Sequence, residues 1–206
     1  MTPEKHKILL FASEKFFRDG FRKVSMDELA KEMKISKKTI YRHFASKGEI
    51  VEATVDSLQT NLKRAIDQII NNDSSSISKL IQMSNTLLNI AFKVSDTWLG
   101  DLRVHSPELW DKIEEFRSKI FMKVFGSILD QGKKEGFIID RPNIIVLTVM
   151  FGGIRSVINP DFLLNNKYSA TEAGKICLDI VITGILTEEG LKIFNKTKME
   201  LNNEKI

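Results

Sequence analysis

The sequence predicts an all-α protein with a small three-helix head at residues 1–46 and a larger helical domain at residues 47–206. Apolar residues recur at helical spacing over nearly the whole chain, and no stretch alternates apolar and polar residues as a half-buried strand does. Glycine and proline are scarce, with 11 and 4 residues among 206, which does not favour a chain rich in turns.

The first 70 residues predict four helices. Pro3 suits a first helical turn, and Gly20 suits the residue after a helix because glycine adopts left-handed backbone angles cheaply. Ser25, Ser36 and Ser46 each suit the N-cap of a following helix, and Glu28 completes a capping-box pattern with Ser25. We expect these helices at about 3–19, 26–33, 37–44 and 47–70.

The remaining chain predicts six further helices, separated by polar or proline-containing breaks. The polar run 71–76 indicates a loop, Pro107 opens a helix, and the segment 132–136 with its two glycines closes it. The Asn159–Pro160 pair is expected to end another helix. We expect helices at about 77–93, 96–104, 107–131, 143–158, 170–187 and 189–199.

The composition argues against several classes of protein. A lone cysteine, Cys177, and three histidines leave no disulfide framework and little for a metal site, so we expect no metal and no cofactor. The longest apolar run, residues 144–154, is shorter than the roughly 20 residues that cross a bilayer. The first residues lack a signal-peptide core, so we expect a cytoplasmic protein without a membrane partner. The chain carries no phosphate-binding loop, dinucleotide fingerprint or zinc-protease motif, so we expect no enzyme and no catalytic residues.

Positive charge is concentrated at the start of the chain. Residues 1–50 hold 12 lysines and arginines against 7 acidic residues, a net charge of +5, whereas the whole chain carries only +4. Such a basic segment on a near-neutral body indicates a surface for a polyanion such as nucleic acid, although a solvated helical surface has the same composition.

Residues 25–47 indicate a helix-turn-helix. Two short helices are separated by a tight turn, and the second helix of such a motif enters the DNA major groove. The apolar residues that can pack the two helices together against the first helix are Leu29, Ala30, Ile35, Ile40 and Phe44.

The outward positions of the helix at 37–44 are all hydrogen-bond donors, and none is acidic. A surface that faces phosphates favours this composition because each bound cation releases counterions from the duplex. Lys47 stands at the start of the next helix, where free N–H groups attract anions. The donors on the helix are Lys37, Lys38, Thr39, Tyr41, Arg42 and His43.

With these residues in place, the sequence resembles the TetR/AcrR family of bacterial regulators over about residues 5–52. The resemblance rests on Ile8, Leu9, Ala12, Phe16, Phe17, Gly20, Val24, Ser25, Leu29, Ala30, Ile35, Ser36, Lys37, Thr39, Ile40, Tyr41, Phe44, Ser46 and Lys47. It implies DNA contacts from Ser25, Lys37, Lys38, Thr39, Tyr41, His43 and Lys47. Two residues depart from the family pattern: Lys34 replaces a turn glycine, and Lys38 replaces a small residue. Lys38 can reach either a guanine edge or a phosphate.

The resemblance also implies a ligand-responsive regulator, most often a repressor that leaves a palindromic double-stranded DNA operator when a small, largely apolar effector binds. The residues that can line the effector site are Met83, Leu87, Trp98, Arg103, His105, Trp110, Phe121, Phe125, Met150 and Arg155. Aromatic and methionine residues at helical spacing usually belong to an ordinary core, and the two tryptophans can simply anchor a connector between helices.

The resemblance further implies a homodimer formed by the last two long helices. The candidate interface residues are Val146, Val149, Gly152, Gly153, Ile180, Val181 and Ile185. A helix glycine costs roughly 1 kcal/mol against alanine, which close helix approach across an interface would justify. A core buried inside one subunit would show the same composition. A rival interpretation of the whole chain is an architectural DNA-binding protein that has no effector.

Overall fold

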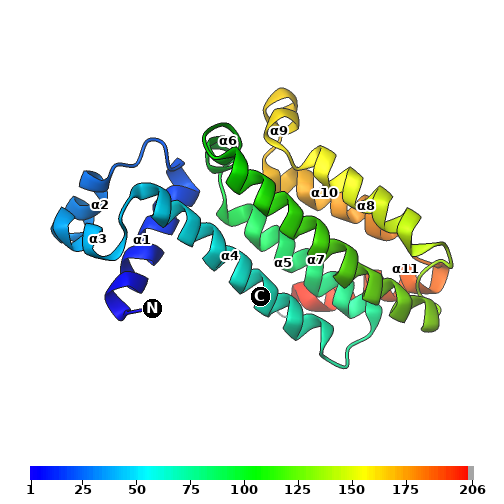
Figure 1. Ribbon diagram of the computed structural model, residues 1–206. Coiled ribbons are helices and arrows are strands. Elements are labelled where there is room, and N and C mark those ends of the chain that lie inside the picture. The colour runs from blue at the N-terminus through cyan, green and yellow to red at the C-terminus, as the bar shows by residue number, and fades with distance from the viewer. Residues whose placement is uncertain (204–206) are drawn as a thin grey trace. The chain divides into compact units, whose positions relative to one another are not determined.

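The computed structural model describes residues 1–203 and confirms an all-α fold (Figure 1). An isolated β-bridge joins Ile138 to Leu186. No helix within residues 1–203 is long and apolar enough to cross a membrane. The helices are α1 (Pro3–Asp19), α2 (Met26–Met33), α3 (Lys37–His43), α4 (Lys47–Ile70), α5 (Ser76–Lys93), α6 (Asp96–His105), α7 (Pro107–Lys134), α8 (Asn143–Val157), α9 (Pro160–Asn166), α10 (Ala170–Thr183) and α11 (Glu188–Asn203).

These helices form two compact units. The first contains residues 1–63 and 92–113, and the second contains residues 64–91 and 114–206. In addition to the head predicted at 1–46, the first unit therefore includes most of α4, all of α6, which packs on α1, and the first residues of α7.

The predicted boundaries of α1, α2 and α4 agree with the structure. The Thr2 hydroxyl accepts a hydrogen bond from the Lys5 N–H, and α1 ends at Gly20, whose φ is 77°. The hydroxyls of Ser25 and Ser36 cap α2 and α3 as predicted, accepting from the N–H groups three residues later. Helix α3 ends one residue early, because Phe44 is extended.

Aromatic side chains fill the core of the first unit around Trp98. This indole stacks 6.2 Å from the ring of Phe16, and its edge contacts with Phe17 and Phe21 are 5.2 and 5.6 Å between centroids. Trp98 is 1% exposed. Trp98, which the sequence predicts as a candidate effector contact, therefore anchors α6 to α1.

The second unit departs from the predicted ends of α7, α10 and α11, and α11 continues to Asn203 beyond the predicted end at 199. Helix α7 continues through Gly132 to Lys134. Gly132 is buried, and a Cβ there would lie 2.6 Å from Cγ1 of Ile138, so this glycine permits close packing and does not end the helix. Helix α10 ends at Thr183, four residues before the predicted end.

A short helix, α9, was not predicted. Helix α8 ends at Val157, just before the Asn159–Pro160 pair, as predicted. The Asn159 side chain also accepts a hydrogen bond from the Phe162 N–H at 3.0 Å and caps a new helix. Pro160 occupies its first position, where the missing N–H costs nothing. Helices α8 and α10 pack together in this unit (Figure 1).

Candidate nucleic-acid interface

The helix-turn-helix is formed by α2, α3 and the turn at residues 34–36. Leu29, Ile40 and Phe44 are at most 1% exposed and join the two helices to the core of the first unit. Lys34 adopts left-handed angles, with φ 56° and ψ 41°, and its N–H bonds to the carbonyls of Ala30 and Lys31. The turn therefore has the shape that a glycine would give, although a lysine occupies it.

A buried lysine fixes α2 to α1. The Lys15 side chain is 7% exposed, and its ammonium forms ion pairs with both Glu28, at 2.5 Å, and Glu32. The hydrogen bond from Lys15 holds the pKa of Glu28 below its usual value, against the opposing effect of desolvation. No local pattern in the sequence indicates these two ion pairs, which hold the first helix of the motif against α1.

The outward face of α3 is cationic and accessible. Lys37, Lys38, Tyr41 and Arg42 are exposed, whereas Ile40 faces the core. Thr39 is partly exposed, and its hydroxyl lies 2.9 Å from the Ser36 hydroxyl. These side chains share one face of a helix that stands at the surface of its unit, as a helix that enters a groove must.

Carboxylates already neutralise part of this surface. Glu4 at the start of α1 accepts from Arg42 at 2.6 Å and lies 2.8 Å from the His43 imidazole. The hydrogen bond with His43, together with Arg42, holds the Glu4 pKa below its usual value. Asp27 forms an ion pair with Lys37. Among the described residues, no carboxylate pairs with Lys38.

Lys47 does not point toward solvent. Its ammonium donates to the carbonyls of Phe21 at 2.9 Å and Val24 at 3.1 Å, in the loop between α1 and α2. Burial lowers the Lys47 pKa, and the nearby Arg22 charge adds to this effect. In this conformation Lys47 supports the loop that leads to Ser25, whose own hydroxyl is used to cap α2.

Comparisons with known proteins agree with this geometry. Residues 8–54 match the family model described as bacterial regulatory proteins, tetR family. The chain is 24% identical to the uncharacterised helix-turn-helix regulator YvaF of Bacillus subtilis, covering 80% of this chain and 87% of YvaF. It is 25% identical to the nucleoid occlusion factor SlmA of Haemophilus influenzae, covering 73% and 72% of the two chains.

A solved structure shows the same fold. The crystal structure of a TetR-family regulator from Marinobacter aquaeolei VT8 superposes with a TM-score of 0.74 at 20% identity, covering 95% of this chain and 98% of that chain.

Residues 8–54 are thus similar to the tetR family of bacterial regulatory proteins. Helices α2 and α3, which form the helix-turn-helix, lie within these matched residues.

The residues predicted to contact an effector are divided between the two units of this chain. Trp98 and Trp110 belong to the aromatic core of the first unit, and Arg103 and His105 are exposed there. Met83, Leu87, Phe121, Phe125 and Met150 belong to the second unit, where Phe121 stacks on Phe125 at 4.4 Å. The Arg155 guanidinium pairs with Glu114 at 2.9 Å.

The residues predicted at a subunit interface differ in exposure. On α8, Val149 is 67% exposed and Gly152 is also exposed, while Ile180 on α10 is 65% exposed. Gly153 and Val181 are partly buried. Val146 and Ile185 are buried within the subunit, so their side chains contribute to its own core.

Proposed function

We propose that this regulator is a homodimeric repressor that leaves a near-palindromic operator when a small, largely apolar effector binds. The observation that supports it most directly is the exposed cationic face of α3, on a head whose buried residues hold that helix at the surface. Its donors match what phosphates and base edges accept, and the acidic residues near it can exchange partners on binding.

Lys38 and Tyr41 are the residues we assign to direct DNA contact. Both are exposed on α3, and Lys38 has no carboxylate to release before it meets DNA. Arg42, His43 and Lys37 first have to leave Glu4 or Asp27, so their contacts depend on exchange of an ion pair. We assign Lys47 to holding the loop between α1 and α2 through its carbonyl contacts.

An exposed apolar surface on α8 and α10 supports dimerisation. These helices pack side by side, and Ile144, Ile145, Val149, Ile176 and Ile180 all expose at least half of their surface. Exposed apolar residues that gather on one face are typical of a protein–protein interface. A Cβ added at Gly152 would meet no atom within 4 Å, which leaves space for close approach by a helix of a second subunit.

The stacked aromatic side chains in the second unit support an apolar effector. Phe121 contacts both Phe125 and Phe151, with centroid separations of 4.4 and 5.1 Å. Helix α4 contributes residues to both compact units, so a change in its position can reach the head. We propose that effector binding biases α4 toward a head spacing that no longer matches major grooves roughly 34 Å apart.

Fluorescence anisotropy with a labelled duplex tests DNA binding, and footprinting tests for a site with two-fold symmetry. We expect Lys38→Ala and Tyr41→Phe to weaken operator binding. Lys192→Ala, at an exposed position of α11, serves as the matched control. In sedimentation velocity, Val149→Glu combined with Ile180→Glu should give a monomer. Failure of the wild-type protein to bind duplex at low ionic strength would refute the proposal.

The similarity to a nucleoid occlusion factor favours one alternative, an architectural DNA-binding role without effector control. The same footprints distinguish the two. A repressor protects a discrete site and dissociates when an effector is added, whereas an architectural protein keeps its affinity in the presence of every candidate effector.

A further inference from the structure

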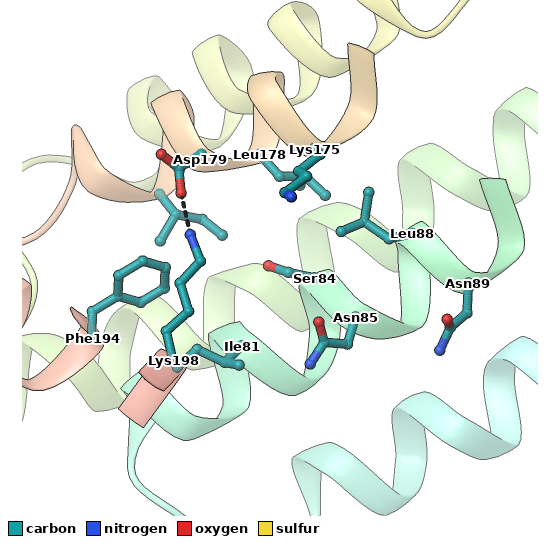
Figure 2. A pocket seen from close by; sticks show the side chains of 11 residues that line it. Ile81, Ser84, Asn85, Leu88, Asn89, Lys175, Leu178, Asp179, Phe194 and Lys198 are labelled. Atoms are coloured by element: carbon teal, nitrogen blue, oxygen red, sulfur yellow. Dashed lines mark hydrogen bonds and ion pairs between the residues drawn. The ribbon is translucent and has the colours of Figure 1, made fainter. Parts of the chain in front are cut away.

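A pocket of about 360 Å³ lies in the second unit between α5, α10 and α11 (Figure 2). None of the residues predicted to contact DNA, an effector or a second subunit lines it. Helix α11 had no functional assignment in the sequence, and here it contributes Phe194 and Lys198 to the wall. The volume is within the usual range for sites that bind small molecules.

The interior of the pocket is apolar. Ile81 from α5, Leu178 and Ile182 from α10, and Phe194 from α11 are each at most 5% exposed and form its inner surface. Leu88 adds a partly buried side chain from α5. A hydrocarbon group placed against these residues would leave water at a gain of about 25 cal/mol per Å².

The rim carries one positive charge in excess. Lys198 pairs with Asp179 at 2.6 Å, and its ammonium lies 5.3 Å from the centre of the Phe194 ring. Lys175 stands one turn before Asp179 on α10, but within residues 1–203 no carboxylate pairs with it. Figure 2 shows Lys175 and Ser84 on opposite sides of the pocket, and Lys198 reaching across to Asp179.

Neutral polar groups stand beside this cation. Asn85 and Asn89 lie one turn apart on α5, and each amide supplies two donors. The Ser84 hydroxyl donates to the Leu80 carbonyl at 2.8 Å, so its oxygen remains an acceptor only. The rim thus favours a ligand with one acceptor-rich anionic end, and the interior favours an apolar remainder.

The place of the lining residues along their helices favours one class of anion over another. The lining residues stand more than one turn inside α5, α10 and α11, so no helix N-terminus supplies free N–H groups to the pocket. Phosphate dianions are commonly bound by such a terminus or by an arginine fork, and a single lysine with amides better matches the lower charge of a carboxylate. We propose that this pocket binds a carboxylate monoanion that carries an apolar chain or ring.

The site is compatible with the proposed dimer. Lys175 and Asp179 are each one residue away from Ile176 and Ile180 on α10, which rotates them by about 100° around the helix axis from that exposed apolar face. The carboxylate site can therefore stay open when a second subunit covers the exposed apolar face of α8 and α10.

Titration calorimetry of the full-length protein with octanoate tests the site. We expect saturable binding to the wild type, a loss of about fivefold in affinity for Lys175→Gln, and a gain for Asp179→Asn, which releases Lys198 from its partner. Lys192→Gln, on α11 but not lining the pocket, should bind octanoate like the wild type. Inorganic phosphate and 1-octanol should bind more weakly than octanoate.

Three results would overturn the proposal. One is an absence of saturable octanoate binding. Another is equal affinity for octanoate in the wild type and in Lys175→Gln, with circular dichroism showing that the variant is folded. The third is binding of 1-octanol as tight as that of octanoate, which would leave the rim charge without a role.

Discussion

Replacement of Gly20 by alanine should destabilise the first unit more than a backbone conformation alone explains. Gly20 has φ 77° and ψ 155°, a region that is nearly restricted to glycine and costs other residues about 1–3 kcal/mol. A Cβ there would also lie 2.6 Å from Oδ2 of Asp101 and 2.7 Å from Cγ2 of Thr97. The alanine therefore strains the backbone and also has to displace the Asp101 and Thr97 side chains of α6.

The displaced carboxylate already has a function. Oδ2 of Asp101 accepts a hydrogen bond from the Arg22 N–H at 2.8 Å, which joins α6 to the loop after α1. Loss of this bond adds about 1 kcal/mol. We expect Gly20→Ala to lower the free energy of unfolding by about 3 kcal/mol in total, measured by urea unfolding at one fixed protein concentration.

Gly136 provides a matched control. Its φ is 76°, but a Cβ there would meet no atom within 4 Å, so Gly136→Ala loses stability only through backbone strain. In an Asp101→Ala background, Gly20→Ala should lower the free energy of unfolding by about 1 kcal/mol less than in the wild type, since the clash with the Asp101 carboxylate has been removed. Equal losses for Gly20→Ala and Gly136→Ala, together with no coupling to Asp101, would refute this reasoning.

Three further predictions concern DNA affinity, pH and the exposed surface of α8. Lys38→Ala should reduce the slope of log affinity against log salt by about 1 and Lys192→Ala should not; an unchanged slope for Lys38→Ala excludes a phosphate contact. The pKa of Glu28 is depressed in the folded protein by Lys15, so its contribution to stability is present above its unfolded pKa, near 4.5, and is lost as pH falls through the lower folded value. The free energy of unfolding of Glu28→Gln should therefore fall less steeply with decreasing pH than that of the wild type, as measured by urea unfolding at several acidic pH values. An identical pH dependence in the two proteins would contradict this role of Glu28. Gly152→Ala should weaken dimerisation in sedimentation experiments even though alanine favours the helix; a variant that gains about 1 kcal/mol and remains equally dimeric would place Gly152 outside the interface.

The sequence predicted the head better than the rest because its signals are local. A serine before each short helix and a glycine after α1 fix boundaries through bonds to residues three or four positions away. Gly132 was misinterpreted because glycine can either end a helix or permit close packing within it. The Asn159–Pro160 pair does follow the end of α8 as predicted, but its second role, as the cap of α9, was missed.

The functional side chains were predicted by type, but their partners were not. Nothing local in the sequence indicates that Glu4 meets Arg42, or that Lys47 turns toward the carbonyls of residues 21 and 24. The pocket was missed for the same reason, because its wall combines three helices from positions about 80, 175 and 195. Contacts between residues so distant in sequence depend on the packing of the whole unit.

The turn between α2 and α3 contains a residue whose backbone conformation costs the fold some stability. Lys34 occupies left-handed angles that cost a residue with a Cβ roughly 1 kcal/mol more than glycine, and nothing in its exposed side chain repays this within the folded protein. The lysine places a positive charge three residues before α3, the helix that we propose faces DNA. On that proposal, Lys34→Gly is expected to stabilise the head and to weaken its binding to a duplex.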